Sequence, residues 1–303
     1  MTDWGVWLHA IRPPRELARL AQSAEELGAK AVLVADEGTD RDLFVTLAEL
    51  AHATQRIMLF GAVTNPHSRH PVALAAGYAT LAELAPGRIV AGIGAGGSRV
   101  FDPMGLAPPR PFTALAECVD VAEALWQGAT VDHAGEFHAR QAALPWSPGR
   151  LPLAIAGRGP RVEQLAAERA DWVLLSGRPV LTVADLVNRL RDVGQITRGR
   201  AAAIAWNPLT AWTDAMREDV RTHLSYMSVD MPHDPVRSET NLLERYAIVG
   251  DRSEVVDRLA HLCMDIRPEL LVFDVGDYSI RYLEDLAQLF MEVGDAHGLD
   301  PHD

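Results

Sequence analysis

Short apolar runs alternate with amphipathic segments along the whole chain. The run AVLVA at Ala31–Ala35 contains no polar position, which is typical of a parallel strand with both faces buried. In Pro13–Gly28, by contrast, apolar residues recur every three or four positions, and this spacing predicts a helix that Gly28 ends. The sequence therefore predicts a regular succession of strands and helices.

Eight strand–helix units follow from this pattern. The predicted strands are Trp4–His9, Ala31–Ala35, Ile57–Ala62, Arg88–Ile93, Leu153–Ala156, Trp172–Leu175, Ala201–Trp206 and Leu270–Phe273. The predicted helices are Pro13–Gly28, Asp40–Ala53, Pro71–Ala85, Phe112–Trp126, Arg161–Arg169, Val183–Thr197, Asp214–Met227 and Tyr278–Val293. Such units in 303 residues favour an α/β fold, a (β/α)8 TIM barrel with insertion segments that forms one domain over residues 1–303. The alternative is a doubly wound sheet of about six or seven strands with a second, small domain.

Two segments interrupt the alternation. Gln127–Pro152 carries little helix signal and contains GEFH at Gly135–His138, so a small hairpin is expected there. Ser228–Gly250 is long, polar and contains prolines, and in a barrel such a segment usually forms a functional loop or lid.

Composition narrows the function classes. The formal net charge of −13 argues against a nucleic-acid partner or an anionic membrane surface. The chain shows no charged-then-apolar leader and no apolar run of about 18–20 residues, so we expect a soluble, cytoplasmic protein. Cys118 and Cys263 lie in helical patterns and are predicted to be buried thiols rather than a disulfide or a metal pair.

A glycine-rich stretch follows the fourth predicted strand. Gly92–Gly97 (GIGAGG) fits G-x-G-x-x-G, but a Rossmann loop needs a helix to begin at once. Four prolines, at positions 103, 108, 109 and 111, predict no helix before about Phe112, and no acid ends a neighbouring strand about 20 residues on. The remaining interpretations are backbone that lies flat against a planar ligand, or tight loop packing.

Several polar residues follow predicted strands, where the functional face of a barrel lies. Asp36 and Glu37 would face this mouth, or would cap the next helix. His9 would be a proton donor or substrate ligand, or a structural histidine. The turn Gly157–Pro160 (GRGP) offers free N–H groups and a helix dipole for a phosphate, or is an ordinary turn. His133 and His138 have metal-like spacing without cysteine partners, and G-x-S-x-G is absent, so neither a metal nor a serine nucleophile is predicted.

Longer stretches resemble a known family. Gly61–Pro71 reads GAVTNPHSRHP and is followed by LAPGR at Leu84–Arg88 and by the glycine-rich strand end. Together with Leu153–Ala167, Ala170–Leu175 and Tyr246–Leu259, these stretches resemble the bacterial-luciferase-like superfamily. Within it the chain is most similar to the coenzyme F420-dependent branch, typified by methylenetetrahydromethanopterin reductases. The resemblance spans nearly the whole chain.

The resemblance implies a cofactor site across the mouth of the barrel. It implies a non-prolyl cis peptide at Ala62–Val63, with this backbone against one face of the ring, and cofactor phosphate bound at residues 157–159. The implied cofactor-binding residues are Asp36, Ala62, Val63, Thr64, Asn65, Gly94, Ala95, Gly96, Gly157, Arg158, Gly159 and Pro160. The candidate catalytic residues are His9, Glu37 and His67, the last beside Asn65–Pro66 where relatives often carry an aromatic side chain.

The chain also departs from the family pattern. Glu37 occupies a position where F420-dependent relatives usually carry histidine. Residues 94–97 are all small, although some F420 enzymes have an acidic proton donor in this loop. Either Glu37, Asp102 or His9 replaces that donor, or the reaction needs no acid at that place.

The predicted function is a coenzyme F420-dependent oxidoreductase that transfers a hydride between the deazaflavin and a small organic substrate. Its implied partners are a second copy of the chain, as a homodimer, and a separate F420 or flavin reductase that recycles the cofactor. One alternative is a reduced-FMN-dependent monooxygenase on the same barrel. The other is a homologue that binds the cofactor without turnover.

Overall fold

A computed structural model of the chain describes residues 2–156, 160–175, 200–209, 247–249, 251–266 and 268–296. The predicted helices Val183–Thr197 and Asp214–Met227 lie outside these residues, as does most of the predicted loop Ser228–Gly250.

All eight predicted strands form, with ends shifted by a few residues at most. The strands of the main sheet are β1 (Asp3–Leu8), β2 (Ala31–Val34), β3 (Met58–Gly61), β4 (Ile89–Gly94), β7 (Leu153–Ala156), β8 (Trp172–Leu175), β9 (Arg200–Leu209), β10 (Ala247–Val249) and β11 (Leu270–Asp274). The helices are α1 (Pro14–Glu26), α2 (Leu43–Ala53), α3 (Pro71–Leu84), α4 (Ser98–Met104), α5 (Pro111–Trp126), α6 (Pro160–Arg169), α10 (Arg252–Ile266) and α11 (Ile280–Ala296). The pattern had not predicted β10, α10 or α4.

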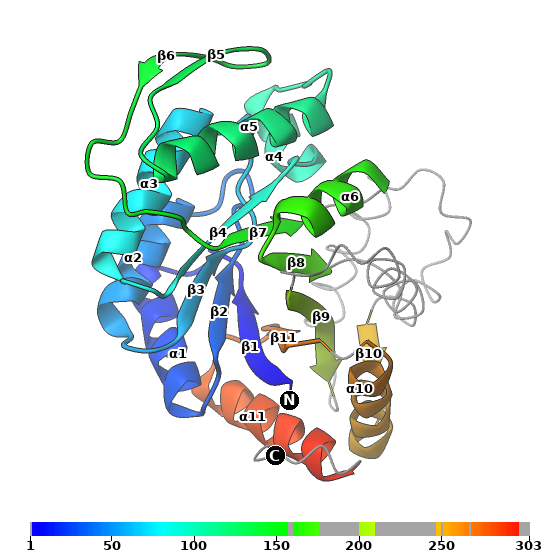
Figure 1. The fold of residues 1–303 in the computed structure, drawn as a ribbon. Helices are drawn as coiled ribbons and strands as arrows, with labels where there is room; N and C mark the ends of the chain where they lie inside the picture. Colours follow the sequence, from blue (N-terminus) through cyan, green and yellow to red (C-terminus); the bar gives the residue numbers. More distant parts are fainter. Residues whose placement is uncertain are drawn as a thin grey trace.

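The strands form one curled parallel sheet with helices on its outer side (Figure 1). Its order is β10-β9-β11-β1-β2-β3-β4-β7-β8, and β9 also pairs with β8. From β1 to β8 the spatial order follows the chain order. A doubly wound sheet reverses its strand order at a switch point. The doubly wound alternative therefore does not fit the observed topology.

Among the strands whose side chains the structure describes, such as β2 and β3, the two faces pack into different cores. Outward-facing residues such as Val34 and Leu59 pack with the helices in one large cluster. Inward-facing residues such as Leu33 and Phe60 form a second cluster inside the curl, where Phe60 meets Trp172 edge-on with ring centroids 5.4 Å apart. Burial on both faces explains why the strands are continuous apolar runs in the sequence.

Two charged groups, buried Glu25 and half-buried Arg88, connect the amino ends of the strands to the neighbouring helices. The Glu25 carboxylate accepts hydrogen bonds from the backbone N–H groups of residues 55–57, just before β3. Arg88, just before β4, donates to the carbonyl of Ala51 at 2.9 Å and to the hydroxyl of Thr54 at 2.9 Å. These contacts join α1, α2 and the start of two strands at the edge of the sheet away from the predicted mouth.

The hairpin expected in residues 127–152 is confirmed. Strands β5 (Val131–Ala134) and β6 (His138–Ala142) pair antiparallel and project beside α5 (Figure 1). Glu117 of α5 holds the hairpin, because its carboxylate accepts from the N–H of Glu136 at 2.7 Å and pairs with His133 Nε2 at 3.0 Å. His133 therefore has a structural role in holding the hairpin against α5.

Cys118 and Cys263 are buried free thiols, as predicted.

The prediction that prolines prevent a helix before Phe112 was wrong. Helix α4 begins directly after Gly97 and contains Pro103. Because Pro103 lies in the last turn of this short helix, its missing N–H removes a single intrahelical hydrogen bond, and its fixed φ is already helical. Gly105, at φ +63°, ends the helix.

Among the described helices, none is long and apolar enough to cross a membrane.

Candidate functional site

The predicted site residues gather at the carboxyl edge of the sheet. His9 follows β1, Asp36 and Glu37 follow β2, residues 62–65 follow β3, and residues 94–97 end and follow β4. Neighbouring parallel strands bring their carboxyl ends to the same edge. We call the residues at this edge the rim: His9, Asp36, Glu37, Asp40, residues 62–65, residues 94–97, Arg99 and Asp274.

His9 lies between two carboxylates from different strands. Its Nδ1 is 3.5 Å from Glu37 Oε2, and its Nε2 is 3.3 Å from Asp274 Oδ1. The ring stacks on Trp7 at an interplanar angle of 20°. The Tyr278 hydroxyl binds both the N–H of His9, at 2.9 Å, and its carbonyl, at 3.2 Å. Backbone and ring of His9 are therefore both fixed in place.

These carboxylates decide the charge of His9. Burial alone would lower its pKa, but the hydrogen bonds and negative charges of Asp274 and Glu37 outweigh burial and raise the pKa from 6.5 to about 10. The two carboxylates therefore favour the imidazolium form of His9 at neutral pH.

Glu37 is shared between His9 and a cation that sequence reasoning missed. Arg99, in α4, forms an ion pair with Glu37, with its Nη1 2.7 Å from Glu37 Oε2. Burial and the nearby charge of Glu37 raise the pKa of Asp40, while Arg99 and His9 lower it. A network of alternating charges thus connects β1, β2 and α4.

Neither Asp36 nor Glu37 caps the next helix. Instead, the carboxylate of Asp42 caps α2 by accepting a hydrogen bond from the N–H of Val45 at 3.0 Å.

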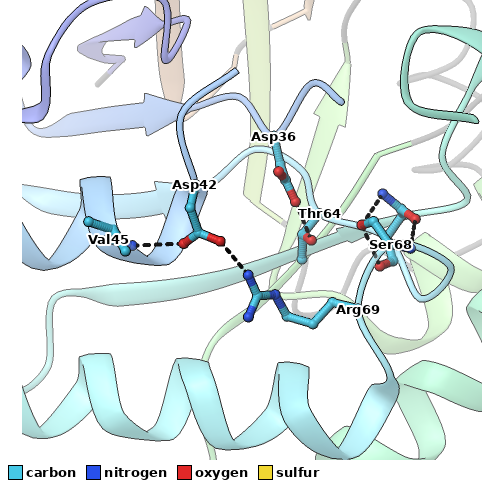
Figure 2. Close-up of polar contacts among 7 residues, drawn as sticks. Asp36, Asp42, Val45, Thr64, Ser68 and Arg69 are labelled. Atoms are coloured by element: carbon cyan, nitrogen blue, oxygen red, sulfur yellow. Dashed lines mark hydrogen bonds and ion pairs between the residues drawn. The ribbon is translucent and has the colours of Figure 1, made fainter. Parts of the chain in front are cut away.

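Asp36 faces away from this network, toward the segment after β3. Its Oδ2 accepts a hydrogen bond of 2.5 Å from the hydroxyl of Thr64 (Figure 2). Burial raises the pKa of Asp36, and the hydrogen bond from Thr64 and the charge of Arg69 oppose this rise. Arg69 itself binds Asp42 Oδ2 at 2.5 Å beside them. The Asp36–Thr64 pair is thus a mostly buried polar group at the rim.

The segment after β3 is bound to the end of β4. The Ala62–Val63 peptide is cis, which confirms the prediction. Thr64 N–H donates to the carbonyl of Gly92 at 3.1 Å, and Gly94 N–H donates to the carbonyl of Thr64 at 2.8 Å. The Asn65 side chain then closes a turn by accepting from the N–H groups of residues 67 and 68.

Two glycines of the GIGAGG stretch are required by packing. A Cβ on Gly92 would lie 1.7 Å from the carbonyl oxygen of Gly61. A Cβ on Gly94 would lie 2.6 Å from a methyl group of Val63. Gly96 has φ +80°, and its Cβ would overlap the ring of Phe101. Packing therefore requires glycine at these positions, and residues 95–97 are the part of the stretch that is at least partly exposed.

His67 lies in an aromatic cluster rather than against His9. Its ring meets Phe101 edge-on at 5.4 Å and Phe137 at 5.9 Å. Burial lowers its pKa, so His67 is neutral at physiological pH, in contrast to His9. Its Nε2 is buried and has no hydrogen-bond partner among the described residues. His70, by contrast, caps α3 through the N–H of Val72.

The predicted phosphate turn is only partly described. Gly157, Arg158 and Gly159 lie outside the described residues, while Pro160 begins α6. Arg161 lies over the Phe112 ring, 3.9 Å from its centroid.

Asp274, Arg99 and Tyr278 were missed by sequence reasoning. Asp274 ends the apolar run LLVFD, so the signal that singled out Asp36 after AVLVA was present there too. Arg99 lies in α4, which the pattern did not predict, and Tyr278 was predicted only as the first residue of the last helix, with no signal that its hydroxyl reaches His9.

A family model described as luciferase-like monooxygenase matches residues 1–264, and the chain belongs to this family. A 5,10-methylenetetrahydromethanopterin reductase of Archaeoglobus fulgidus is 30% identical over 80% of this chain and 69% of that protein. An F420-dependent glucose-6-phosphate dehydrogenase of Nakamurella multipartita is 36% identical over 59% of this chain and 58% of that relative. The predicted family resemblance is thereby confirmed.

Solved structures agree with the fold. An F420-dependent secondary alcohol dehydrogenase, in complex with an F420-acetone adduct, superposes with a TM-score of 0.80 at 20% identity over 96% of this chain and 99% of that one. The monooxygenase RslO1 from Streptomyces bottropensis gives 0.76 at 20% identity over 98% of this chain and 100% of that one. At these identities the comparison supports the architecture.

Proposed function

We propose that the chain is a coenzyme F420-dependent oxidoreductase that transfers a hydride between the deazaflavin and a small organic substrate. The observation that carries this proposal is the rim itself, in a chain whose relatives include F420-dependent enzymes. A buried Asp36–Thr64 pair lies beside the cis Ala62–Val63 peptide and the glycine-rich end of β4. Bound F420 would supply the hydride chemistry.

The residues of the rim fit a planar cofactor. Val63 and residues 95–97 present small side chains or bare backbone and are partly exposed. The buried Nε2 of His67 has no partner among the described residues, as expected for an atom that a bound group satisfies. We propose that Asp36, residues 62–65 and residues 94–96 hold the ring, and that residues 157–160 hold its phosphate. His9, Glu37 and His67 are proposed to face the reacting substrate.

The proposal includes the architecture around this site. We propose that residues 1–303 complete one (β/α)8 barrel domain, which the pairing of β9 with both β8 and β11 supports. A homodimer, a cytoplasmic location and a separate reductase that recycles the cofactor stay predictions.

Titration with F420 and with FMN tests the proposal. Quenching of protein and cofactor fluorescence should give tighter binding of F420. Thr64→Val removes one hydrogen bond at nearly constant volume and should weaken F420 binding about five- to tenfold. Thr80→Val is the matched control, because Thr80 lies on the exposed side of α3 and its hydroxyl donates to the carbonyl of Ala76 in the same helix. Equal binding by both variants would contradict the assigned site.

Turnover assays then separate the alternatives. Reduced F420 is mixed with a panel of small carbonyl, imine and alkene acceptors, and cofactor oxidation is followed. The family's monooxygenase description favours reduced FMN as the second candidate, which would require oxygen consumption with FMN. Tight F420 binding without turnover across the panel would favour the non-catalytic homologue.

A further inference from the structure

Asp274 has the geometry of a residue that acts through His9. It ends β11, its side chain is 8% exposed, and its Oδ1 lies 3.3 Å from His9 Nε2. Glu37, on the other side of the ring, is farther from His9 at 3.5 Å and binds Arg99 more closely at 2.7 Å. Asp274 forms an ion pair with His9, and the described residues place no other cationic side chain within ion-pair distance of its carboxylate.

We propose that Asp274 is a positioning residue for His9: its carboxylate fixes the imidazole and keeps it protonated, so that His9 donates a proton at the rim. The identity of the acceptor rests on the proposed function, but the state of His9 does not. His9 supplies the acid that residues 94–97 lack. The side chain of His9 is 12% exposed, so one edge of it is within reach of a bound molecule.

The proton balance of this step is simple. His9 gives the proton on Nδ1, whose 3.5 Å contact with Glu37 is the longer of its two carboxylate contacts, to the oxygen of a substrate carbonyl while the carbonyl carbon receives a hydride. The C=O π pair becomes the pair that binds the proton, and His9 is left neutral until solvent reprotonates it. Reduced deazaflavin of the proposed function is the source of the hydride and is oxidised. A histidine that stays charged at neutral pH suits this reductive direction better than proton removal from an alcohol.

Other charged groups surround His9 and influence its charge. Glu37 and Asp40 reach it from the β2–α2 loop, Asp274 from β11, and Arg99 from α4 through Glu37. Arg41 binds the carbonyl of the adjacent Ala10, and the Tyr278 hydroxyl binds the His9 backbone. Of the two carboxylates that touch the ring, Asp274 makes the shorter contact and has no described cation besides His9. It should therefore control the charge of His9 most.

The test uses cofactor-free protein with isotope-labelled histidine. NMR follows the imidazole signals from about pH 5 to pH 11, and His9→Gln identifies the signals of His9 among the 11 histidines. In the wild type, His9 should stay charged through neutral pH. In Asp274→Asn its midpoint should fall by about one to three pH units. Asp274→Glu should retain most of the high midpoint.

A neighbouring acid gives the control. Asp277 is exposed, lies in the same loop and accepts from Ser279 at 3.2 Å, so Asp277→Asn should leave the midpoint of His9 unchanged. A wild-type His9 that titrates near 6.5, or an Asp274→Asn midpoint equal to that of the wild type, would overturn the inference. If Asp274→Asn does not fold, the wild-type titration and Asp274→Glu still decide it.

Activity provides a second readout that a purely structural role would not move. Reductive turnover should decline at alkaline pH as His9 loses its proton, and in Asp274→Asn that decline should begin at lower pH. If F420 does not bind, the proposed function fails while the NMR result stands. If F420 reacts and His9 nevertheless titrates normally, only the inference on Asp274 fails.

Discussion

Glu25 shows how a single buried charge stabilises a connection far from the rim. Three backbone N–H groups of residues 55–57 donate to it. Burial raises its pKa, but these hydrogen bonds and the charge of Arg56 outweigh burial, so its pKa in the folded chain lies below 4.5. A lowered pKa means that the stabilisation is complete above the unfolded value and is lost as pH falls through the folded value. Glu25→Gln should therefore lower the free energy of unfolding at pH 7 by roughly 1–3 kcal/mol.

Urea unfolding at several pH values checks this. The difference between wild type and Glu25→Gln should be largest at neutral pH and should shrink below pH 4.5 as Glu25 becomes protonated. Glu26→Gln is the matched control, because Glu26 is the next residue, is exposed and accepts a hydrogen bond from Gln22 of its own helix. A pH-independent difference for Glu25→Gln would show that its charge contributes nothing.

At the scale of elements, the contact between the end of β4 and the segment after β3 depends on small residues. Gly94→Ala should destabilise the fold by roughly 1–3 kcal/mol, because the new Cβ would lie 2.6 Å from Val63 Cγ2. Val63→Ala removes that methyl group and should recover part of the loss. A double-mutant cycle from urea unfolding measures the coupling.

Gly92→Ala is the contrasting variant. Its Cβ would meet the backbone carbonyl of Gly61 at 1.7 Å, and no side-chain substitution can move that atom away. Val63→Ala should therefore rescue Gly94→Ala and not Gly92→Ala. Equal rescue of both variants would mean that the segment after β3 relaxes as a whole.

The elements also show what the sequence could predict. The continuous apolar runs predicted all eight strands, because burial on both faces leaves no other pattern. Helix α4 was missed because prolines were taken as absolute breakers, although Pro103 lies in its last turn. Helix α10 has an amphipathic pattern, with Val255 and Leu259 buried, that was present in the sequence but not used.

The candidate site was predictable only in part. Asp36, Glu37 and His9 each follow an apolar strand, so their meeting at one edge follows from the fold. Which groups pair there depends on side-chain directions that sequence spacing does not give: Asp36 turns to Thr64, while Glu37 turns to His9. The family resemblance, rather than the pattern, predicted the cis peptide at Ala62–Val63.

At the scale of the whole molecule, the two edges of the sheet have separate roles. Charges at the amino edge bind backbone groups within the fold, as buried Glu25 and half-buried Arg88 do. Charges at the carboxyl edge bind one another between elements, as His9, Glu37 and Arg99 do. A fold divided in this way can change its rim without disturbing the edge that stabilises it.

This division predicts how a cofactor should act on the chain. At a free concentration about 100 times its Kd, F420 should raise the free energy of unfolding by about 2.7 kcal/mol. Amide hydrogen exchange that proceeds by local opening should slow at residues 62–65 and 92–97, where β3 and β4 end. Residues 55–57, held by Glu25 at the opposite edge, should exchange at an unchanged rate. A ligand protects first the amides that it touches or orders. If F420 slowed exchange at residues 55–57 but not at the rim, the cofactor would therefore bind elsewhere.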